Sequence, residues 1–271
     1  MKKFALDEKN FLKLALLMAG LVMVFSSVSY IIMSYSTPII PQRNSMSNSI
    51  IKKNLNNLNI DNKKVLSAAE SIISTENNMQ MLPNMSTIYE KNNDVVGWIK
   101  INDTVINYPV MQSKNDGEFY LYRNFYKDKD INGSIFIDKH CTLSPRSTNL
   151  IFHGHNMNNG SMFGALIKYK SKDFYQNHKQ IAFDTLYENQ LYEIVSVFIS
   201  KVYNVTDNVF KYYRFYNANN KEEFDYFFNN IKEMSLYDTN VNAEYGDSFI
   251  TLSTCENSIK NGRFVVVAKK I

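Results

Sequence analysis

Two apolar runs separated by a short polar loop close the chain. The first run, residues 248–255, ends on Cys255, and the second, residues 263–268, begins on Arg263. Both runs are rich in β-branched and aromatic residues, a composition typical of strands. If the 256–262 loop joins them as an antiparallel hairpin, Cys255 and Arg263 become cross-strand partners with Cβ atoms about 4.5–5.5 Å apart. The sequence therefore predicts a hairpin in which a thiol faces a permanent cation, an arrangement suited to nucleophilic chemistry.

Near the N-terminus, residues 14–32 form an almost unbroken apolar run, roughly the 20 residues that a helix needs to cross a bilayer. The basic residues around it are Lys2, Lys3, Lys9 and Lys13 before the run and Arg43 after it. The positive-inside rule then places residues 1–13 in the cytoplasm as a basic tail. A cleaved signal peptide is the competing interpretation, but no Ala-x-Ala site follows the run. We expect an uncleaved single-pass anchor over residues 14–35, with everything after it outside the cytoplasm.

Length, charge and cysteine content narrow the class of protein. A chain of 271 residues with a net charge of +4 can form a sizeable core, and no stretch is basic enough for a nucleic-acid footprint. We therefore exclude DNA and RNA as partners. The two cysteines, Cys141 and Cys255, could pair as a disulfide outside the cell. A chain of this size does not need such a link, and the hairpin gives Cys255 another use, so we favour free thiols.

The spacing of apolar residues changes along the chain from one typical of helices to one typical of strands. Residues 36–92 indicate a linker followed by N-terminal helices, including a helical stretch near 86–92 after Pro83. We expect residues 93–271 to form the catalytic domain. Its predicted strands are 95–101, 105–110, 134–138, 149–155, 180–186, 191–203 and the closing pair, with helices at 162–170 and 221–235. Many short strands with few helices favour a mainly β barrel over a parallel α/β sheet.

A nucleophilic cysteine needs an imidazole nearby to take or give a proton. Of the four histidines, His155 is the best candidate because it ends a predicted strand and is followed by a loop. His153 and His155 would share one strand face, which raises a metal site as an alternative, but no further ligand spacing supports one. We expect no metal, and we place His153 in the pocket wall. We interpret Cys141, which adjoins a predicted loop, as a bystander.

Several motifs between residue 95 and the C-terminus resemble those of sortases, and in detail those of class B. They are Val96-Gly97-Trp98-Ile99, Tyr108-Pro109-Val110, Gly133-Ser134-Ile135-Phe136, Gly154-His155, Thr251-Leu252-Ser253-Thr254-Cys255 and Gly262-Arg263-Phe264-Val265-Val266-Val267-Ala268-Lys269. The Thr-Leu-x-Thr-Cys motif is fairly specific when an arginine opens the next strand and a Gly-His pair precedes it. One departure is His153, where class B sequences often have a tyrosine.

The resemblance implies a closed eight-stranded sortase-type β-barrel with N-terminal helices, one long helix before the final hairpin and a single transmembrane helix. It also implies a cysteine transpeptidase on the outer face of a Gram-positive cell, without a cofactor. Such an enzyme cleaves an NPxTx-like C-terminal sorting signal of secreted surface proteins through a thioacyl intermediate. An amine of a peptidoglycan precursor or cross-bridge then resolves that intermediate.

The resemblance assigns roles by position. It makes Cys255 the nucleophile, His155 the general acid and base, and Arg263 the clamp for the oxyanion and the substrate. The residues implied in the signal groove are Leu121, Ser253, Glu256, Val209 and Phe210, beside His153. Two alternatives remain: an extracytoplasmic cysteine endopeptidase that hydrolyses its substrate, and a non-catalytic surface binding module.

Overall fold

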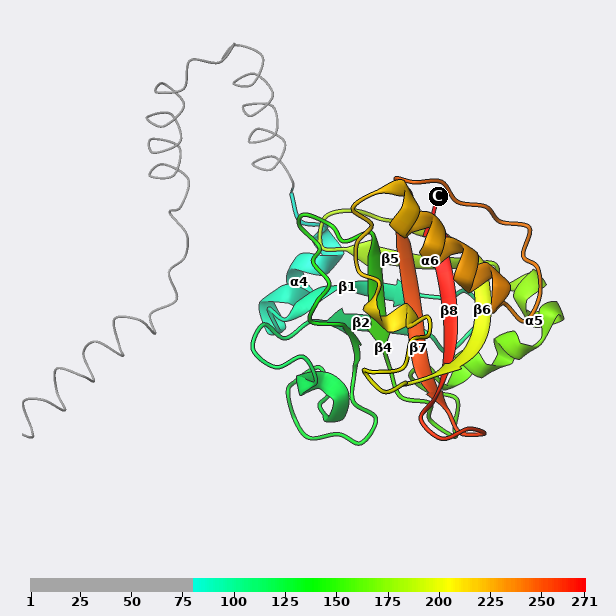
Figure 1. Ribbon diagram of the computed structural model, residues 1–271. Helices are drawn as coiled ribbons and strands as arrows, with labels where there is room; N and C mark the ends of the chain where they lie inside the picture. The colour runs from blue at the N-terminus through cyan, green and yellow to red at the C-terminus, as the bar shows by residue number, and fades with distance from the viewer. Residues whose placement is uncertain (1–79) are drawn as a thin grey trace, which may run out of the picture. The chain divides into compact units, whose positions relative to one another are not determined.

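The structure, a computed structural model, describes residues 80–271 (Figure 1). The predicted anchor over residues 14–35, the linker after it and the first of the predicted N-terminal helices lie outside the described residues. Within residues 80–271, no helix combines the length and the apolar character that a bilayer crossing requires.

Eight strands form a closed barrel, which confirms the eight-stranded β-barrel that the resemblance implied. In order of pairing they are β1 (Val95–Lys100), β2 (Asn107–Met111), β3 (Ile135–Ile137), β4 (Asn149–His153), β7 (Phe249–Glu256), β8 (Gly262–Lys270), β6 (Leu191–Lys201) and β5 (Gln180–Thr185), and β5 closes onto β1. Neighbours are antiparallel except for the parallel pairs β2–β3 and β4–β7. The β4–β7 pair matters most for function, because it places two distant segments of the chain side by side.

The closing hairpin has the predicted register. β7 and β8 pair antiparallel, and Cys255 stands opposite Arg263. The β1–β2 hairpin also turns where the sequence predicted, and Asp103 there has a φ of 58°. Short polar side chains tolerate this left-handed conformation better than branched ones, so an aspartate suits the turn.

Side-chain alternation gives β7 and β8 two buried faces. Leu252 and Val266 pack inside the barrel, whereas Val265 and Val267 pack on the outside under α6 (Lys221–Glu233). Figure 1 shows α6 lying across the outer face of β6, β7 and β8. Its buried face is Phe224, Phe227 and Ile231. Each such side chain contributes roughly 1.5–3 kcal/mol of burial free energy, so the helix is held firmly on these strands.

A cap that resembles a capping box begins α6. The Asn220 side chain accepts a hydrogen bond from the Glu223 amide at 2.8 Å, and Glu223 Oε2 accepts one from the Asn219 amide at 2.9 Å. The first contact satisfies an amide that the first helical turn leaves unpaired, and the second holds the residue before the cap. The helix therefore begins at a fixed residue and follows directly on the segment around η3 (Tyr212–Arg214).

Three boundaries differ from the prediction. The helix predicted near 86–92 begins earlier, since α4 spans Pro83–Lys91: proline has no amide hydrogen and fits the first helical turn. The predicted 162–170 helix is the 3₁₀ helix η2 (Gly164–Lys170), and α5 (Lys172–Asn177), which was not predicted, follows it. β4 ends at His153, so His155 lies in the loop beyond the strand.

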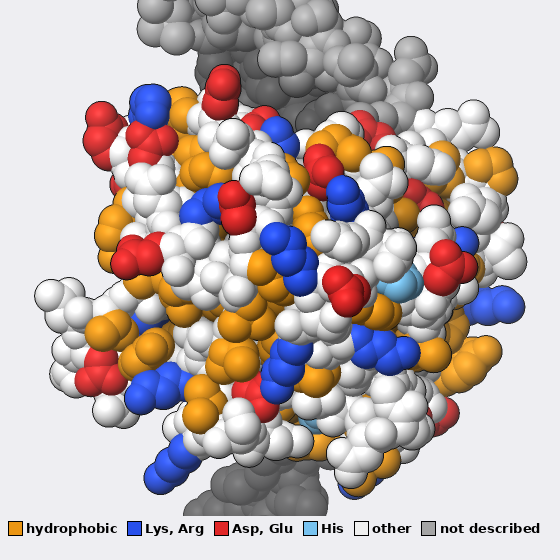
Figure 2. Space-filling view, turned by 90° about the vertical axis from the view of Figure 1, so that its right-hand side faces the viewer, with side chains coloured by type: hydrophobic (Ala, Val, Ile, Leu, Met, Phe, Trp, Pro, Cys, Tyr) orange, Lys and Arg blue, Asp and Glu red, His pale blue; other side chains and the backbone are white. Residues whose placement is uncertain are grey.

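Basic and acidic side chains are interspersed on the face of the molecule in Figure 2. No large patch of one sign stands out on that face. This distribution agrees with the mild net charge of +4.

Candidate functional site

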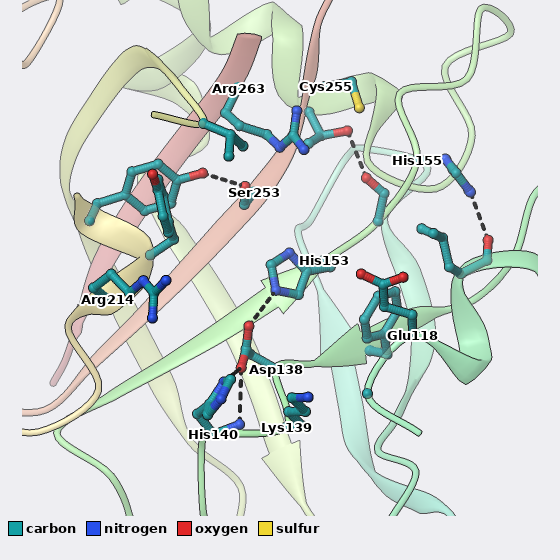
Figure 3. A pocket seen from close by; sticks show the side chains of 18 of the residues that line it. Glu118, Asp138, Lys139, His140, His153, His155, Arg214, Ser253, Cys255 and Arg263 are labelled. Carbon is teal, nitrogen blue, oxygen red and sulfur yellow. Dashed lines mark hydrogen bonds and ion pairs between the residues drawn. The ribbon is translucent and has the colours of Figure 1, made fainter. Parts of the chain in front are cut away.

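A cavity of about 640 Å³ opens on the outer surface, where β4, β7 and β8 meet the segments around η1 (Phe119–Tyr122) and η3 (Figure 3). Two groups of side chains line it. Cys255, His155 and Arg263 form one group, the cysteine end, and Asp138, His140 and His153 form the other, the aspartate end. The cavity therefore brings the predicted nucleophile, base and cation together.

Cys255 is exposed, and the strand geometry explains why. Ser253 and Cys255 project from the same face of β7, and this is the outer face that α6 covers further along the strand. Ser253 is buried below the cavity, with its Oγ 2.8 Å from the Tyr212 hydroxyl. Arg263 stands opposite Cys255 and donates from Nη1 to the Gly262 carbonyl at 2.9 Å. No acidic side chain within residues 80–271 pairs with this guanidinium, so it is available to a developing negative charge.

Three hydrogen bonds tie the loop that carries His155 to the end of β7. The parallel register pairs His153 with Ser253, so the chain beyond β4 runs beside Cys255. Thr254 Oγ1 donates to the Gly154 carbonyl at 2.7 Å, Gly154 N donates to the Ser253 carbonyl at 3.3 Å, and Asn156 Nδ2 donates to the Cys255 carbonyl at 2.8 Å. These bonds lie on both sides of His155 in the sequence. They fix the backbone of His155 relative to the backbone of Cys255.

Gly154 is required by packing just before His155. A Cβ at this position would lie 2.5 Å from Cδ1 of Ile135 and 2.8 Å from Cδ2 of Phe163. Both neighbours belong to the barrel core, where such an approach would force a rearrangement. The Gly-His pair of the sequence motif thus has a steric basis.

The His155 ring is oriented by a backbone carbonyl. Its Nε2 lies 2.7 Å from the Leu121 carbonyl oxygen, and the Tyr122 ring packs with its centroid 5.3 Å away. A carbonyl oxygen only accepts hydrogen bonds, so Nε2 carries a proton. In the neutral ring the lone pair is then on Nδ1, which bonds no other group within residues 80–271. This nitrogen can take up and return a proton.

At the aspartate end, one carboxylate bonds two imidazoles. Asp138 Oδ2 lies 3.1 Å from His153 Nε2, and Oδ1 lies 2.8 Å from His140 Nδ1. The His140 ring also stacks on Tyr216, with centroids 5.1 Å apart. Burial by itself would raise the pKa of Asp138, but the hydrogen bonds from His153 and His140 outweigh it and lower the pKa below the usual range. Asp138 is therefore a carboxylate that holds both rings in place.

Cys141 is free and buried, and so it forms no disulfide with the exposed Cys255. Its Sγ lies 3.4 Å from both the Asn149 carbonyl and the Ile151 amide. Burial raises the pKa of this thiol to about 12. A thiol with such a pKa and no solvent access is a poor nucleophile.

The predicted groove residues divide into two sets. Leu121, Ser253 and His153 line the cavity. Glu256, Val209 and Phe210 do not, so the cavity lining gives no support to their predicted role in substrate binding. Glu256 follows Cys255 on β7, so its side chain points to the opposite face, where its carboxylate pairs with Lys170 at 2.8 Å. Phe210 packs against Tyr226 and Phe227 of α6, while Val209 is exposed outside the cavity.

The residues that line the cavity in place of Val209 and Phe210 come slightly later in the chain. They are Tyr212, Tyr213, Arg214 and Tyr216, in and after η3. The sequence predicted no role for Asp138 or His140, which also line the cavity. The run of aromatic residues around Arg214 over 212–216 was the available signal for this wall. Nothing local in the sequence links Asp138 to His153.

The structure gives no support to a metal site. Within residues 80–271, no group of three or more histidine, cysteine or acidic side chains is placed to hold a metal ion. The two histidines of the His-x-His pattern bond separate partners, since His153 bonds Asp138 and His155 bonds the Leu121 carbonyl.

Comparison with known proteins agrees with this geometry. The family model of the sortase domain matches residues 99–271. Sortase B of Listeria monocytogenes is 34% identical over 220 residues, which cover 79% of this chain and 86% of that protein. Sortase B of Staphylococcus aureus is 33% identical over 191 residues, which cover 70% of this chain and 75% of that protein.

Solved structures give the same result. A Bacillus anthracis protein described as similar to sortase B superposes with a TM-score of 0.63 at 34% identity, covering 72% of this chain and 85% of that chain. The Staphylococcus aureus sortase B–substrate complex superposes with a TM-score of 0.63 at 30% identity, covering 84% of this chain and 99% of that chain.

Proposed function

Because the chain belongs to the sortase family, as a class B cysteine transpeptidase, we propose that it attaches secreted surface proteins to peptidoglycan from the outer face of the membrane. Its substrate is an NPxTx-like C-terminal sorting signal. Its acceptor is an amine of a peptidoglycan precursor or cross-bridge. The single observation that carries the proposal is the exposed Cys255 opposite Arg263, with the His155 loop bonded to the same strand end.

In the first half of the reaction, His155 Nδ1 takes the proton of the Cys255 thiol, and the resulting thiolate attacks the backbone carbonyl carbon of the threonine in the signal. The negative charge that develops on the carbonyl oxygen faces the Arg263 guanidinium, whose fixed donors stabilise it. The peptide C–N bond then breaks, and the leaving amine takes a proton from His155 Nδ1. The products are a thioacyl enzyme and the released C-terminal segment.

In the second half, the acceptor amine attacks the thioacyl carbon and gives up a proton to His155 Nδ1. The C–S bond breaks, and Cys255 leaves as a thiolate. The imidazolium then returns this proton to the Cys255 thiolate, which restores the thiol and the neutral ring, so the cycle closes without a cofactor. His155 can serve both steps because Nε2 stays bonded to the Leu121 carbonyl throughout while Nδ1 changes its proton.

The walls of the cavity supply the groove for the signal. Leu121 and Tyr122 border the cysteine end, and Tyr212 and Tyr213 border the opposite wall. Aromatic walls with a few placed polar groups are typical of sites that bind a small extended ligand. We assign the sorting signal to this groove, with its scissile bond at Cys255.

The N-terminal apolar run completes the proposal. Residues 14–35 anchor the chain in the membrane, and the lysines before them keep the N-terminus in the cytoplasm. Fractionation of cells that express the full chain tests the anchor. A version without residues 1–35 is the control. We expect the full chain in the membrane fraction and accessible to protease from outside the cell, and a full chain found in the cytosolic fraction would contradict the anchor.

A peptide assay tests the transfer. The full chain is incubated with an NPxTx-type peptide, with and without an oligoglycine or diaminopimelate-type amine, and products are identified by mass spectrometry. We expect a thioacyl adduct on Cys255 and an amine-dependent ligation product. Hydrolysed product alone, whatever amine is supplied, would contradict transfer to peptidoglycan. Absence of any adduct across a panel of peptides would contradict the substrate class.

A further inference from the structure

A buried polar network holds the segment whose carbonyl orients His155. Leu121 lies in η1 beside Tyr120, which is 1% exposed. The Tyr120 hydroxyl accepts a hydrogen bond from Asn92 Nδ2 at 2.9 Å and donates one to Asp94 Oδ2 at 2.8 Å. Asn92 ends α4, so the network joins that helix to η1.

The same network also holds the far side of the loop after η1. Asn92 Nδ2 donates to the Phe125 carbonyl at 2.7 Å, and Lys127 Nζ lies 2.9 Å from Asp94 Oδ2. The Asn92 side chain also accepts a hydrogen bond from the Asp94 amide at 3.0 Å. Every polar atom of the Asn92 side chain thus has a partner, as a buried amide requires.

A second segment fixes the carbonyl oxygens of η1 from the opposite side. The Ser134 amide donates to the Tyr120 carbonyl at 3.0 Å. Gly133, at a φ of +59°, packs so closely that a Cβ there would collide with the Leu121 carbonyl oxygen and lie 2.8 Å from that of Tyr120. The Leu121 carbonyl therefore occupies one place, set by Tyr120 on one side and Gly133 on the other.

We propose that Tyr120 and Asn92 are positioning residues for His155: they hold η1 so that the Leu121 carbonyl keeps the proton on Nε2 and the lone pair on Nδ1. If η1 shifts, the neutral ring is free to adopt the other tautomer, which places a hydrogen where the reaction needs a lone pair. The inference rests on the proposed role of His155 as acid and base. Neither Tyr120 nor Asn92 is among the residues that line the cavity, so both act through η1.

The test compares Tyr120→Phe with a matched control, Tyr175→Phe. Tyr175 is also buried, at 3% exposure, and its hydroxyl donates to the Thr239 carbonyl at 3.1 Å, away from the cavity lining. Each variant loses one buried phenol hydroxyl and keeps the ring. Tyr120→Phe loses two hydrogen bonds and Tyr175→Phe loses one, so the control removes less hydrogen-bond free energy. Thermal unfolding of the full chain, kept in a mild detergent, checks that both variants fold.

Two readouts separate positioning from stability. The first is the long-range ¹H–¹⁵N spectrum of histidine-labelled protein, in which His155 signals are assigned by their loss in His155→Gln. We expect Nε2–H only in the wild type and in Tyr175→Phe, and a mixture of tautomers in Tyr120→Phe. The second is the rate of thioacyl formation, which we expect to fall by up to about 100-fold in Tyr120→Phe, since small misplacements of catalytic groups have effects of this order.

A third variant covers the possibility that Tyr120→Phe unfolds. Asp94→Asn removes the ion pair with Lys127 and weakens the acceptor of the Tyr120 hydroxyl, and we expect a smaller change of the same kind in both readouts. An unchanged His155 tautomer in Tyr120→Phe, or a rate loss no larger than that of Tyr175→Phe, would overturn the proposal. The spectrum needs no sorting peptide, so it tests this inference even if the proposed substrate fails.

Discussion

The two ends of the cavity both present imidazoles but bond them differently. At the aspartate end, His140 and His153 each bond the same carboxylate, Asp138. At the cysteine end, His155 bonds an uncharged backbone carbonyl, that of Leu121. A carboxylate attracts the charged form of a ring and resists its loss of a proton, whereas a carbonyl orients the ring with much less charge bias.

This difference separates a structural use of histidine from a catalytic one. A ring that must both take and release a proton in the reaction needs a fixed orientation and a free nitrogen close to the reacting atoms. The loop of His155 is bonded to the end of β7 beside Cys255, whereas His153 bonds Asp138 at the other end of the cavity. Two histidines that line one cavity, His155 and His153, thus have different roles although they are two residues apart in the sequence: His155 carries a proton and His153 forms part of the wall.

The largest expected difference in activity is between substitutions of the two cysteines. Cys255→Ala should abolish thioacyl formation, because no other exposed thiol lies within residues 80–271. Cys141→Ala should retain near-wild-type activity, since that thiol is buried and burial raises its pKa to about 12. Peptide cleavage and iodoacetamide labelling of the folded protein measure both. Loss of activity in Cys141→Ala, with folding intact, would overturn the choice of nucleophile.

The two histidines give the next largest effect and test the comparison directly. His155→Ala should lower the rate of thioacyl formation by about 10²–10⁴-fold, the range typical of a general acid or base. His153→Ala should have a much smaller effect, because its Nε2 bonds Asp138 and it only lines the wall. The pH dependence of kcat/KM for both variants completes the measurement. A larger loss of rate in His153→Ala than in His155→Ala would identify His153 as the base instead.

Substitution of Arg263 should have the third largest effect on the reaction rate. Removing an oxyanion donor typically costs about 10²–10³-fold in kcat, and we expect this loss in Arg263→Ala. Arg214→Ala is the matched control, because Arg214 also lines the cavity but lies away from Cys255 (Figure 3). Steady-state kinetics should show the Arg263 effect mainly in kcat and the Arg214 effect mainly in KM. Equal effects on kcat would show that Arg263 contributes only general positive charge.

The parts of the site that sequence could predict are those set by local geometry. Hairpin register follows from strand alternation and a short loop, so Cys255 and Arg263 could be paired from the sequence alone. The motif around Gly154 and His155 supplied the base, although the strand ends at His153. The barrel closure came from the family resemblance, because strand composition does not specify which strands pair.

The parts that sequence could not predict depend on contacts between distant segments. Asp138 meets His153 only because β3 pairs with β4, and the η3 wall replaces Val209 and Phe210 because α6 draws Phe210 onto itself. The position of Glu256 away from the cavity has a different cause. Its neighbour Cys255 faces the cavity, and adjacent residues on a strand face opposite ways.

The smallest expected effect is at the aspartate end. Hydrogen bonds from His153 and His140 outweigh burial and lower the pKa of Asp138 in the folded protein. The stability that these bonds contribute is therefore present in full above about pH 4, the usual pKa range of aspartate, and is lost as the pH falls toward the lowered folded value. Asp138→Asn should cost on the order of 1–3 kcal/mol of unfolding free energy at neutral pH.

Urea unfolding of the full chain between neutral and strongly acid pH measures this cost, with the exposed Asp128→Asn as control. The difference between wild type and Asp138→Asn should shrink as the pH falls, while the control shows no such change. Thioacyl formation should fall only slightly, because the carboxylate holds a wall of the groove and carries no proton in the reaction. A rate loss as large as that of His155→Ala would show that both ends of the cavity act in the chemistry.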